Sequence, residues 1–178
     1  GKTLNGIPLL KIAIDCINQS KYLTDIYVST DNEITAENAR LFGAKSSFLR
    51  PKELSEEHID VTEVVRFTLE RIETQEAASP ELVVVLEEGY PFRKPIHLDL
   101  MVERLLEGGF DTVIAGTPEE RGIWLEKNGE LELLGEGFMP RRLKTTRYMV
   151  GLVGYCCVTY PDLIRSNNLL GLKTGLFE

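Results

Sequence analysis

The densest run of basic side chains in this 178-residue sequence is Arg141, Arg142, Lys144 and Arg147. Guanidinium and ammonium groups packed this closely along the chain can neutralise phosphate oxygens or pair with a carboxylate through charge-assisted hydrogen bonds. They can equally form a solvated strand edge. Charge alone favours the solvated edge over a binding site.

Other candidate side chains stand directly after expected strands. Asp31 and Arg50 each follow a short β-rich run, and Glu87 and Arg93 bracket the segment after an apolar run. In open α/β sheets, ligands bind beyond the carboxyl ends of the strands. Binding chemistry is therefore expected at residues 29–31, 50–51, 87–93 and 141–147.

The sequence lacks the motifs of several common metal-dependent, hydrolytic and nucleotide-binding enzyme classes. His58 and His97 are the only histidines, and neither has a Cys or Glu partner at ligand spacing, which argues against a zinc site. GxSxG, Walker and GxGxxG motifs are missing from the sequence. Cys16, Cys156 and Cys157 are too few for a disulfide framework and are expected to be reduced core residues.

Composition limits the class of protein further. The sequence is 43% hydrophobic and 27% charged with a formal net charge of -8, which is typical of a globular domain and disfavours a nucleic-acid partner. No apolar run reaches the roughly 18 residues of a membrane span, and no signal-peptide pattern opens the sequence. We expect a cytoplasmic protein without a membrane partner.

Helical and strand periods alternate along the chain, which predicts a single α/β domain over residues 1–178. We expect three layers, with a mainly parallel central sheet flanked by helices. The run LVVVL at 82–86 is apolar throughout and predicts the centre of that sheet. Helices are expected over 8–19, 32–43, 61–72, 96–106 and 161–165, and strands over 25–29, 46–49, 82–86, 112–115 and 149–158.

Two strand-like runs between residues 122 and 134 flank Asn128-Gly129. This dipeptide is the strongest short signal for a tight hairpin turn, because both positions favour positive φ. A β-hairpin arm is therefore predicted.

The motifs also form an ordered series: NGIPLL, VSTDNE, FGAK, LRPKEL and VVVLEEGYPFR. The series resembles the cytidylyltransferase family of CMP-sialic acid (acylneuraminate) synthetases and related acidic-sugar nucleotidyltransferases, over most of residues 5–115 and more loosely 138–165. The resemblance implies a nucleotide-diphospho-sugar transferase-like fold and transfer of CMP from CTP to an acidic sugar, with release of pyrophosphate. It also implies Mg²⁺ as cofactor and a homodimer with residues 122–148 as the dimerisation arm, the alternative for that segment being a solvent-exposed hairpin.

The resemblance also implies roles for individual residues of the nucleotide pocket. Arg50 matches the arginine of the family's LRPxEL motif, which contacts the cytosine base; an Arg50–Glu53 ion pair is the alternative. Asp31 is similar to the acidic residue near the nucleotide pocket, with a helix cap as the equally weighted alternative. Ile59 and Val61 take the places of small and serine residues that meet the base.

For the acceptor sugar, the resemblance implies a second group of residues. Glu87 and Arg93 lie in the segment that reads LQPTSPLR in the family. Arg141, Arg142 and Lys144 are similar to a basic segment near the sugar carboxylate or the phosphates. No catalytic residue is assigned within this chain.

Several residues depart from the family pattern. Glu87 replaces a neutral amide and should repel an acidic sugar, because like charges in a partly buried site cost more than in water. Val61 offers no hydroxyl, Val153-Gly154-Tyr155 replaces a polar stretch, and Asp60 is better explained as a helix cap. The family's opening strand with its basic glycine-containing loop, and its closing metal-binding aspartates, are not found within residues 1–178.

These departures leave two other hypotheses open. One is a degenerate, non-catalytic member of the fold that serves as a binding or assembly module. The other is a sugar-nucleotide transferase that uses a different base, since fold alone does not fix function.

Overall fold

The computed structural model describes residues 1–135, 143 and 146–178. The helices of this part are α1 (Leu9–Ile17), α2 (Glu33–Leu41), α3 (Val61–Gln75), α4 (Pro95–Gly108), α5 (Pro161–Arg165) and a 3₁₀ turn, η1 (Lys52–Ser55). The strands are β1 (Thr3–Leu4), β2 (Ile7–Pro8), β3 (Val83–Val85), β4 (Thr112–Glu119), β5 (Ile123–Lys127), β6 (Glu130–Leu134), β7 (Tyr148–Gly151), β8 (Cys157–Thr159) and β9 (Thr174–Phe177).

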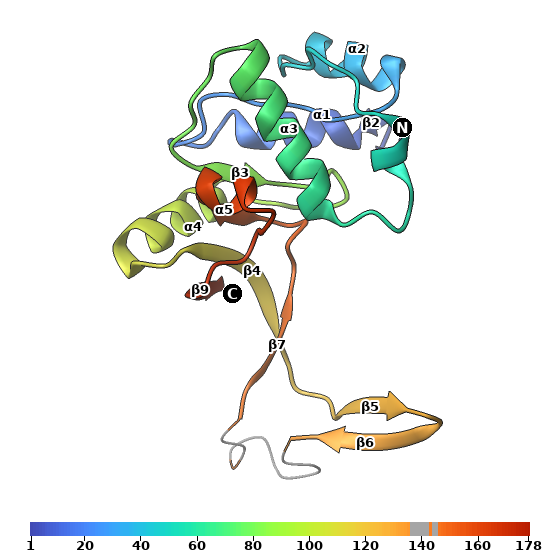
Figure 1. The fold of residues 1–178 in the computed structure, drawn as a ribbon, viewed down its shortest axis with the longest axis vertical. Helices are drawn as coiled ribbons and strands as arrows, with labels where there is room; N and C mark the ends of the chain where they lie inside the picture. The colour runs from blue at the N-terminus through green and yellow to red at the C-terminus, as the bar shows by residue number, and fades with distance from the viewer. Residues whose placement is uncertain (136–142, 144–145) are drawn as a thin grey trace.

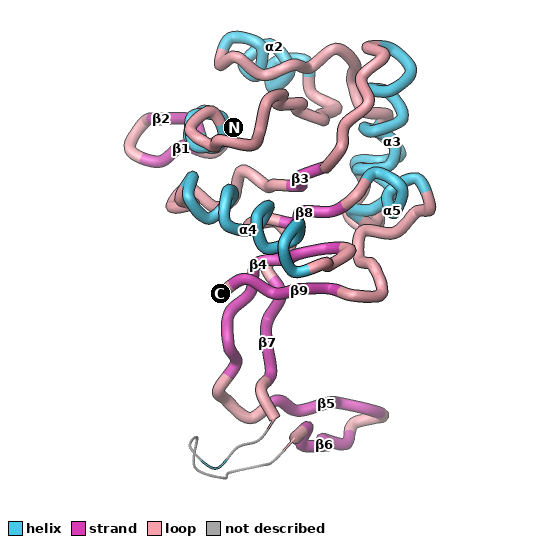
Figure 2. The backbone as a smooth tube through the Cα atoms, turned by 90° about the vertical axis from the view of Figure 1, so that its left-hand side faces the viewer, coloured by secondary structure: helices cyan, strands magenta, loops and turns pink. Residues whose placement is uncertain are grey.

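Helices cover both faces of a central sheet, so the predicted α/β class and layering are confirmed. The sheet has the order β3-β8-β4-β7, with β9 beside β4. Helix α4 lies on one face, and α3 and α5 lie on the other (Figure 2). Helix α1 packs on the same side as α4, because Cys16 and Ile17 join the cluster formed by Leu98 and Met101.

The direction of the strands differs from the prediction of a mainly parallel sheet. Strand β8 pairs antiparallel with both β3 and β4, and β7 pairs antiparallel with β4; the β4–β9 pair is parallel. The reason lies in the connection. The chain leaves the sheet along β4 and returns along β7, so that it enters β8 reversed, without the helical crossover that parallel neighbours need.

Strand β3 is not the centre of this sheet, contrary to the expectation from its apolar run. It stands at one end of the strand order, and Val83, Val84 and Val85 are each half-buried. The central strand is β4, which pairs with β7, β8 and β9. A continuous apolar run is typical of burial between helices and does not by itself set the position within the sheet.

The predicted strand over 149–158 is in fact two strands with a turn between them. Tyr155 N–H donates to Leu152 C=O (2.9 Å), and Leu152 N–H donates to Ala115 C=O (2.7 Å). This turn separates β7, which leads back from the arm, from β8, whose residues are all buried. Apolar composition is the same on both sides of the turn, so composition does not mark the break, and the glycine within the run is the local signal of a turn.

The expected strands over 25–29 and 46–49 are reduced to a single parallel bridge between Tyr27 and Lys45. Val28 N–H donates to Lys45 C=O (2.8 Å), and Lys45 N–H donates to Ile26 C=O (2.7 Å). These segments nevertheless run side by side, and both lead to candidate residues.

Local signals for caps and turns are confirmed. Asp60 accepts a hydrogen bond from Thr62 N–H (2.7 Å) at the start of α3, and Gly109 ends α4 in the left-handed conformation (φ 59°). Asn128 and Gly129 have φ of 53° and 83°, as a two-residue hairpin turn requires. The resulting β5–β6 hairpin projects from the body at the end of the β4–β7 ribbon (Figure 1).

The core is built mainly on α4. Leu98, Met101 and Leu105 have no exposed surface and pack with Val113 of β4 and Val158 of β8. The three cysteines are buried and free, as expected. Residues on the opposite side of α4, such as Leu106, are exposed.

Candidate functional site

Two of the predicted nucleotide-binding residues are brought together at the end of the bridge segment. Arg50 N–H donates to Thr30 C=O (2.8 Å), which places Arg50 beside the Thr30-Asp31 corner. The two residues are far apart in the sequence. They are adjacent in space because the segment that precedes Thr30 and the segment that precedes Arg50 run parallel, joined by the Tyr27–Lys45 bridge. The structure thus gathers the ends of two strand-like segments in one place.

The Arg50 side chain is half-buried and directed by one hydrogen bond. Its Nε donates to Ser55 Oγ (3.0 Å) in η1, and Ser55 Oγ lies within reach of Pro51 C=O (3.4 Å). The ion pair with Glu53, proposed as the alternative, is not formed in the described structure. The two terminal nitrogens of Arg50 bond to none of the described residues, so their planar donors are available to a ligand.

Asp31 is exposed, and its carboxylate has no partner among the described side chains. The cap of α2 is its neighbour: Asn32 Oδ1 accepts from Thr35 N–H (3.0 Å). The helix-cap alternative for Asp31 is therefore wrong, and the role of cap belongs to Asn32. Thr30 contributes a buried hydroxyl that accepts from Asn32 N–H (3.2 Å) and shapes the corner.

Ile59 and Val61 flank Asp60, the residue that caps α3. Ile59 is half-buried, while Val61 is 39% exposed, so both present aliphatic surface near the start of the helix. Asp60 between them caps the helix, and hydrogen bonds from Thr62 lower the pKa of its carboxyl group. Asp60 is thus explained as a structural residue, as the sequence indicated.

Arg93 is placed inside the protein. It is 5% exposed, and its guanidinium donates to three backbone carbonyls: Tyr155 (2.6 Å), Glu87 (2.7 Å) and Gly154 (3.0 Å). Its Nη1 is buried without a partner in the described structure, and burial lowers the pKa of the guanidinium. The rings of Tyr90 and Tyr155 lie 5.8 and 5.5 Å from it. Arg93 joins the loop after β3 to the turn before β8.

Glu87 lies at the outer end of this connection. Its backbone N–H donates to Gly154 C=O (2.8 Å), and its side chain is exposed. None of the described Lys, Arg or His residues pairs with its carboxylate. The structure therefore brings Glu87 and Arg93 together, as expected. The contact is a hydrogen bond from Arg93 to the backbone carbonyl of Glu87 and does not involve the Glu87 side chain.

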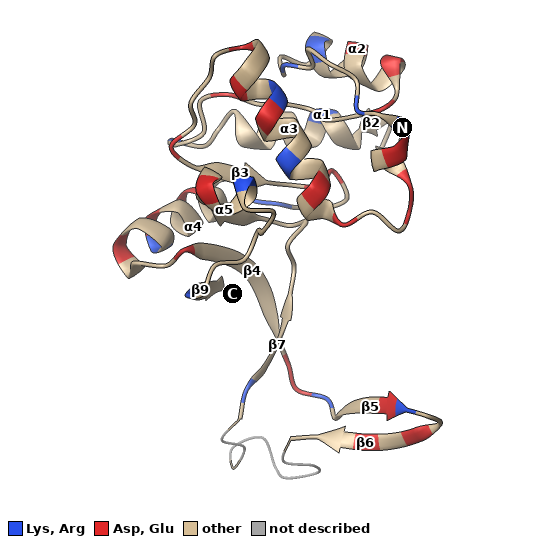
Figure 3. Ribbon diagram, viewed as in Figure 1, with Lys and Arg blue, Asp and Glu red and all other residues tan. Residues whose placement is uncertain are grey.

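The predicted basic segment can be followed only in part. Arg141, Arg142 and Lys144 lie outside the described residues. Arg147, at the end of that segment, pairs with Glu178 (Nη2–Oε2 2.7 Å). Over the described chain, acidic and basic residues are interspersed along the helices and the arm (Figure 3).

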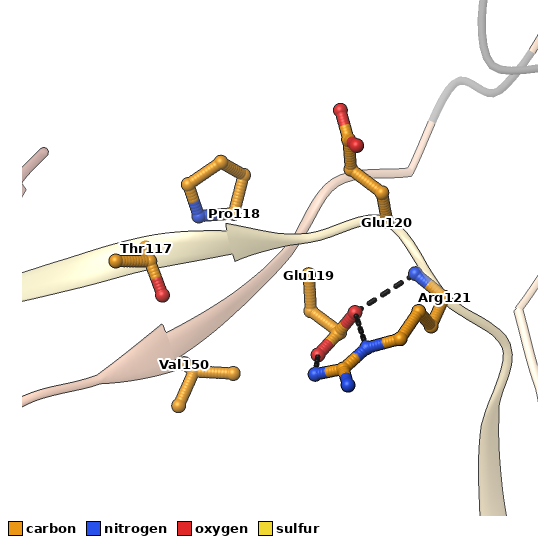
Figure 4. Close-up of a pocket in the computed structure, with 6 residues that line it drawn as sticks. All are labelled: Thr117, Pro118, Glu119, Glu120, Arg121 and Val150. Carbon is orange, nitrogen blue, oxygen red and sulfur yellow. Dashed lines mark hydrogen bonds and ion pairs between the residues drawn. The ribbon is translucent and has the colours of Figure 1, made fainter.

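A hollow of about 460 Å³ opens where the arm leaves the body. It is lined by Thr117, Pro118, Glu119, Glu120, Arg121 and Val150 (Figure 4). Arg121 holds Glu119 through its backbone N–H (2.8 Å) and its guanidinium, which lowers the pKa of Glu119 to about 2. None of the predicted site residues lines this hollow, and its ion pair is already satisfied, so we do not place the chemistry there.

Sequence reasoning missed the residues that organise the second group. Tyr155 bonds His97 (Oη–Nδ1 2.7 Å), and burial lowers the pKa of that histidine. Gly154 lies directly under the Glu87 side chain. A glycine inside the apolar run 149–158 was the available signal, since glycine in a strand pattern indicates a turn or a close approach.

No three His, Cys, Asp or Glu side chains of the described residues are grouped so that they could hold a metal ion. No helix in this part of the chain is both long and apolar enough to cross a membrane.

Comparison with known proteins gives one family. The family model described as cytidylyltransferase matches residues 2–151. The chain is 25% identical over 135 residues to the pseudaminic acid cytidylyltransferase of Campylobacter jejuni subsp. jejuni serotype O:2, covering 74% of this chain and 58% of that protein. It is 25% identical over 147 residues to N-acylneuraminate cytidylyltransferase A of Danio rerio, covering 79% of this chain and 33% of that protein. The chain thus spans less than two thirds of these relatives.

Solved structures share the fold at low identity. A CMP:2-keto-3-deoxy-manno-octonic acid synthetase complexed with CTP superposes with a TM-score of 0.66 at 12% identity, covering 93% of this chain and 68% of that chain. A 4-diphosphocytidyl-2C-methyl-D-erythritol synthase from Anaerococcus prevotii gives 0.63 at 13% identity, covering 98% and 78%. These likenesses establish the architecture.

Proposed function

Because the chain belongs to the cytidylyltransferase family, we propose that it forms part of an enzyme that transfers CMP from CTP to an acidic sugar and releases pyrophosphate. The names of the relatives, a pseudaminic acid and an N-acylneuraminate cytidylyltransferase, support the acidic sugar as acceptor class.

The observation that carries the proposal is the placement of Arg50. Its backbone is fixed to Thr30 and its Nε to Ser55, while its terminal nitrogens keep their donors free. A planar guanidinium held in this way can donate to the neighbouring O2 and N3 acceptors of cytosine, whereas uracil has an N3–H donor beside O2 and adenine has no carbonyl group. In this proposal Ile59 and Val61 offer apolar surface to the same base, and Asp31 lies beside the nucleotide.

The reaction we propose is a displacement at phosphorus. A hydroxyl oxygen of the sugar forms a bond to the α-phosphorus of CTP and its proton is lost to water. The bond from the α-phosphorus to the oxygen that bridges to the β-phosphorus breaks, and pyrophosphate leaves with both electrons of that bond. Catalysis of this kind depends on positioning and on stabilising charge at the phosphate oxygens. The basic residues Arg141, Arg142 and Lys144 are our candidates for that charge or for the carboxylate of the sugar.

Mg²⁺ is part of the proposal as the cofactor that would neutralise phosphate charge. The described residues offer no group of three His, Cys, Asp or Glu side chains to hold it. No step is therefore assigned to an ion bound by these residues.

We also propose a homodimer formed through the arm, residues 122–148. Trp124 is 48% exposed and Leu131 is 66% exposed, and they belong to opposite strands of the hairpin. A two-stranded sheet alone is marginally stable in water, so covering its apolar side chains would stabilise it. A second copy of the chain is the partner we favour.

Calorimetric titration of the full-length protein with CTP, UTP and ATP in the presence of Mg²⁺ tests the nucleotide assignment. We expect CTP to bind selectively and Arg50→Ala to weaken it by about 10- to 100-fold, the effect of losing hydrogen bonds from a charged donor. Lys52→Ala, two residues away and exposed, is the matched control and should leave CTP binding unchanged.

The same titration separates the other hypotheses. Preference for UTP or ATP would favour a transferase with another base. Absence of binding to all three nucleotides would contradict the proposal and favour a non-catalytic assembly module. CTP binding in this titration, together with no CMP-sugar formed from an acidic sugar in a separate turnover assay, would favour a degenerate binding module.

A further inference from the structure

One buried arginine joins the two segments that meet at the carboxyl end of β3. Arg93 Nη2 donates to the carbonyls of Glu87 (2.7 Å) and Gly154 (3.0 Å), and its Nε donates to that of Tyr155 (2.6 Å). Because these acceptors are backbone atoms, the guanidinium fixes the course of both segments and makes no hydrogen bond to the Glu87 side chain.

Besides accepting the hydrogen bond from Arg93, Gly154 leaves room for the Glu87 side chain. A Cβ at position 154 would lie 2.7 Å from Oε1 and 2.6 Å from Oε2 of Glu87, well inside van der Waals contact. The φ of Gly154 is not among the positive values of the chain, so its backbone does not itself demand glycine. Glycine is needed here because the Glu87 carboxylate lies over it.

Glu87 is therefore fixed without an ion pair. Its backbone is held on both sides, by N–H to Gly154 and by C=O from Arg93, and its side chain rests on Gly154. No described basic residue pairs with the carboxylate, which is exposed at the end of a strand where ligands bind in this class of fold. An ionised carboxylate accepts hydrogen bonds and cannot donate them.

We propose that Gly154 and Arg93 are positioning residues that hold the Glu87 carboxylate open to accept hydrogen bonds from hydroxyl groups of the acceptor sugar. This inference rests on the proposed function and refines its substrate class. The hydroxyl-bearing side of the acidic sugar faces Glu87. The carboxylate of the sugar points away from Glu87, because two like charges repel.

The test compares Gly154→Ala with Gly89→Ala, a glycine of the same loop whose Cβ would meet nothing within 4 Å. The added methyl at 154 strikes the far end of a flexible side chain, so Glu87 should swing away while the fold is kept. The readouts are the affinities for CTP and, at saturating CTP without Mg²⁺, for N-acetylneuraminic acid and pseudaminic acid, measured by calorimetry on the full-length protein.

We expect Gly154→Ala to weaken sugar binding about tenfold and to change CTP affinity less than twofold, with no effect from Gly89→Ala. Glu87→Gln should weaken the sugar to a similar extent, and adding Gly154→Ala to it should cause little further loss. Arg93→Lys keeps the charge but cannot reach three carbonyls, so it should weaken the sugar as well. Unchanged sugar affinity in Gly154→Ala or in Glu87→Gln would overturn the inference.

A second measurement keeps the positioning claim separate from the proposed function. The thermal midpoint of unfolding is compared for Gly154→Ala in the wild-type and the Glu87→Ala backgrounds. We expect a lower midpoint in the first and almost no shift in the second, because the clash needs the Glu87 side chain. Equal shifts in both backgrounds would overturn the positioning claim, whereas a protein that binds neither CTP nor sugar but shows this coupling would contradict the proposed function alone.

Discussion

At the scale of single residues, the two arginines of the candidate site differ in their hydrogen-bond partners. The terminal nitrogens of Arg50 bond to none of the described residues, whereas Arg93 donates three hydrogen bonds to backbone carbonyls. The sequence alone makes these two arginines look alike, since both follow strands. Their different burial separates a group that can meet a ligand from a group that holds the loop in place.

The buried thiols give a prediction at this scale. Burial raises the pKa of both Cys156 and Cys157 to about 12, and it also raises the pKa of Cys16. Because the thiolate is the reactive form, all three should resist Ellman's reagent at pH 8 in the native protein. Titration of the native protein should give almost no reaction over minutes, and three thiols should react once guanidinium chloride unfolds it. Rapid reaction of a native thiol would contradict the burial described for these residues.

Residue roles could be predicted from the sequence where they depend on near neighbours. Asp60 caps α3, which begins one residue later, and Gly109 ends α4 directly before it. Both roles could therefore be predicted without knowledge of the fold. Arg93 could not be assigned in this way. Its acceptors at Gly154 and Tyr155 lie 61 and 62 residues further along the chain.

At the scale of elements, α4 is the helix on which the core depends. Leu105 is fully buried and Leu106, its neighbour in the sequence, is 55% exposed. Leu105→Ala should lower the free energy of unfolding by about 2–5 kcal/mol, because it leaves a cavity between α4 and the sheet. Urea unfolding monitored by circular dichroism measures this change.

Leu106→Ala provides the control on the same helix. It should shift the free energy of unfolding by no more than about 0.5 kcal/mol, as surface substitutions usually do. Equal effects of the two substitutions would contradict the orientation of α4 against the sheet.

Elements were predictable where the pattern itself changes. Asn128-Gly129 marked the β5–β6 hairpin, and the 3.6-residue period marked α4. The glycine within 149–158 indicated a turn, but the division into β7 and β8 also depends on a hydrogen bond from Leu152 to Ala115 in a distant strand, which the sequence does not show. The pairing of β9 with β4 was missed for the same reason: Thr174 lies opposite Thr112.

At the scale of the whole molecule, the arm is the feature that the body does not stabilise. In Figure 1 the β5–β6 hairpin extends away from the helices. Trp124 is the largest apolar side chain exposed on it. If the arm forms the proposed dimer interface, Trp124→Glu should place a charge in that interface and shift the protein to monomers.

Sedimentation equilibrium of the full-length protein measures this shift. Lys127→Ala, on the same strand but at the polar turn, is the control and should leave the dimer intact. A monomeric wild-type protein, or a dimer that tolerates Trp124→Glu, would contradict the arm as the interface.

The α/β class and its layers could be predicted from alternating periods, while the sheet's direction could not. Direction depends on how each strand is reached, and here the route through the arm reverses β8 relative to β3 and β4. Their positions after expected strands already grouped Arg50 with Asp31, which the structure places at one corner. The family resemblance added the nucleotide as the ligand to be expected there.

Cytidylyl transfer itself is the central claim, and ³¹P NMR of the full-length protein with CTP, Mg²⁺ and an acidic sugar tests it most directly. We would use pseudaminic acid and N-acetylneuraminic acid as separate acceptors. The account predicts that pyrophosphate and a CMP-sugar phosphodiester appear in equal amounts, only when a sugar is present, and far more slowly with Arg50→Ala. CTP that stays intact with both sugars, or that yields pyrophosphate without a CMP-sugar, would contradict it.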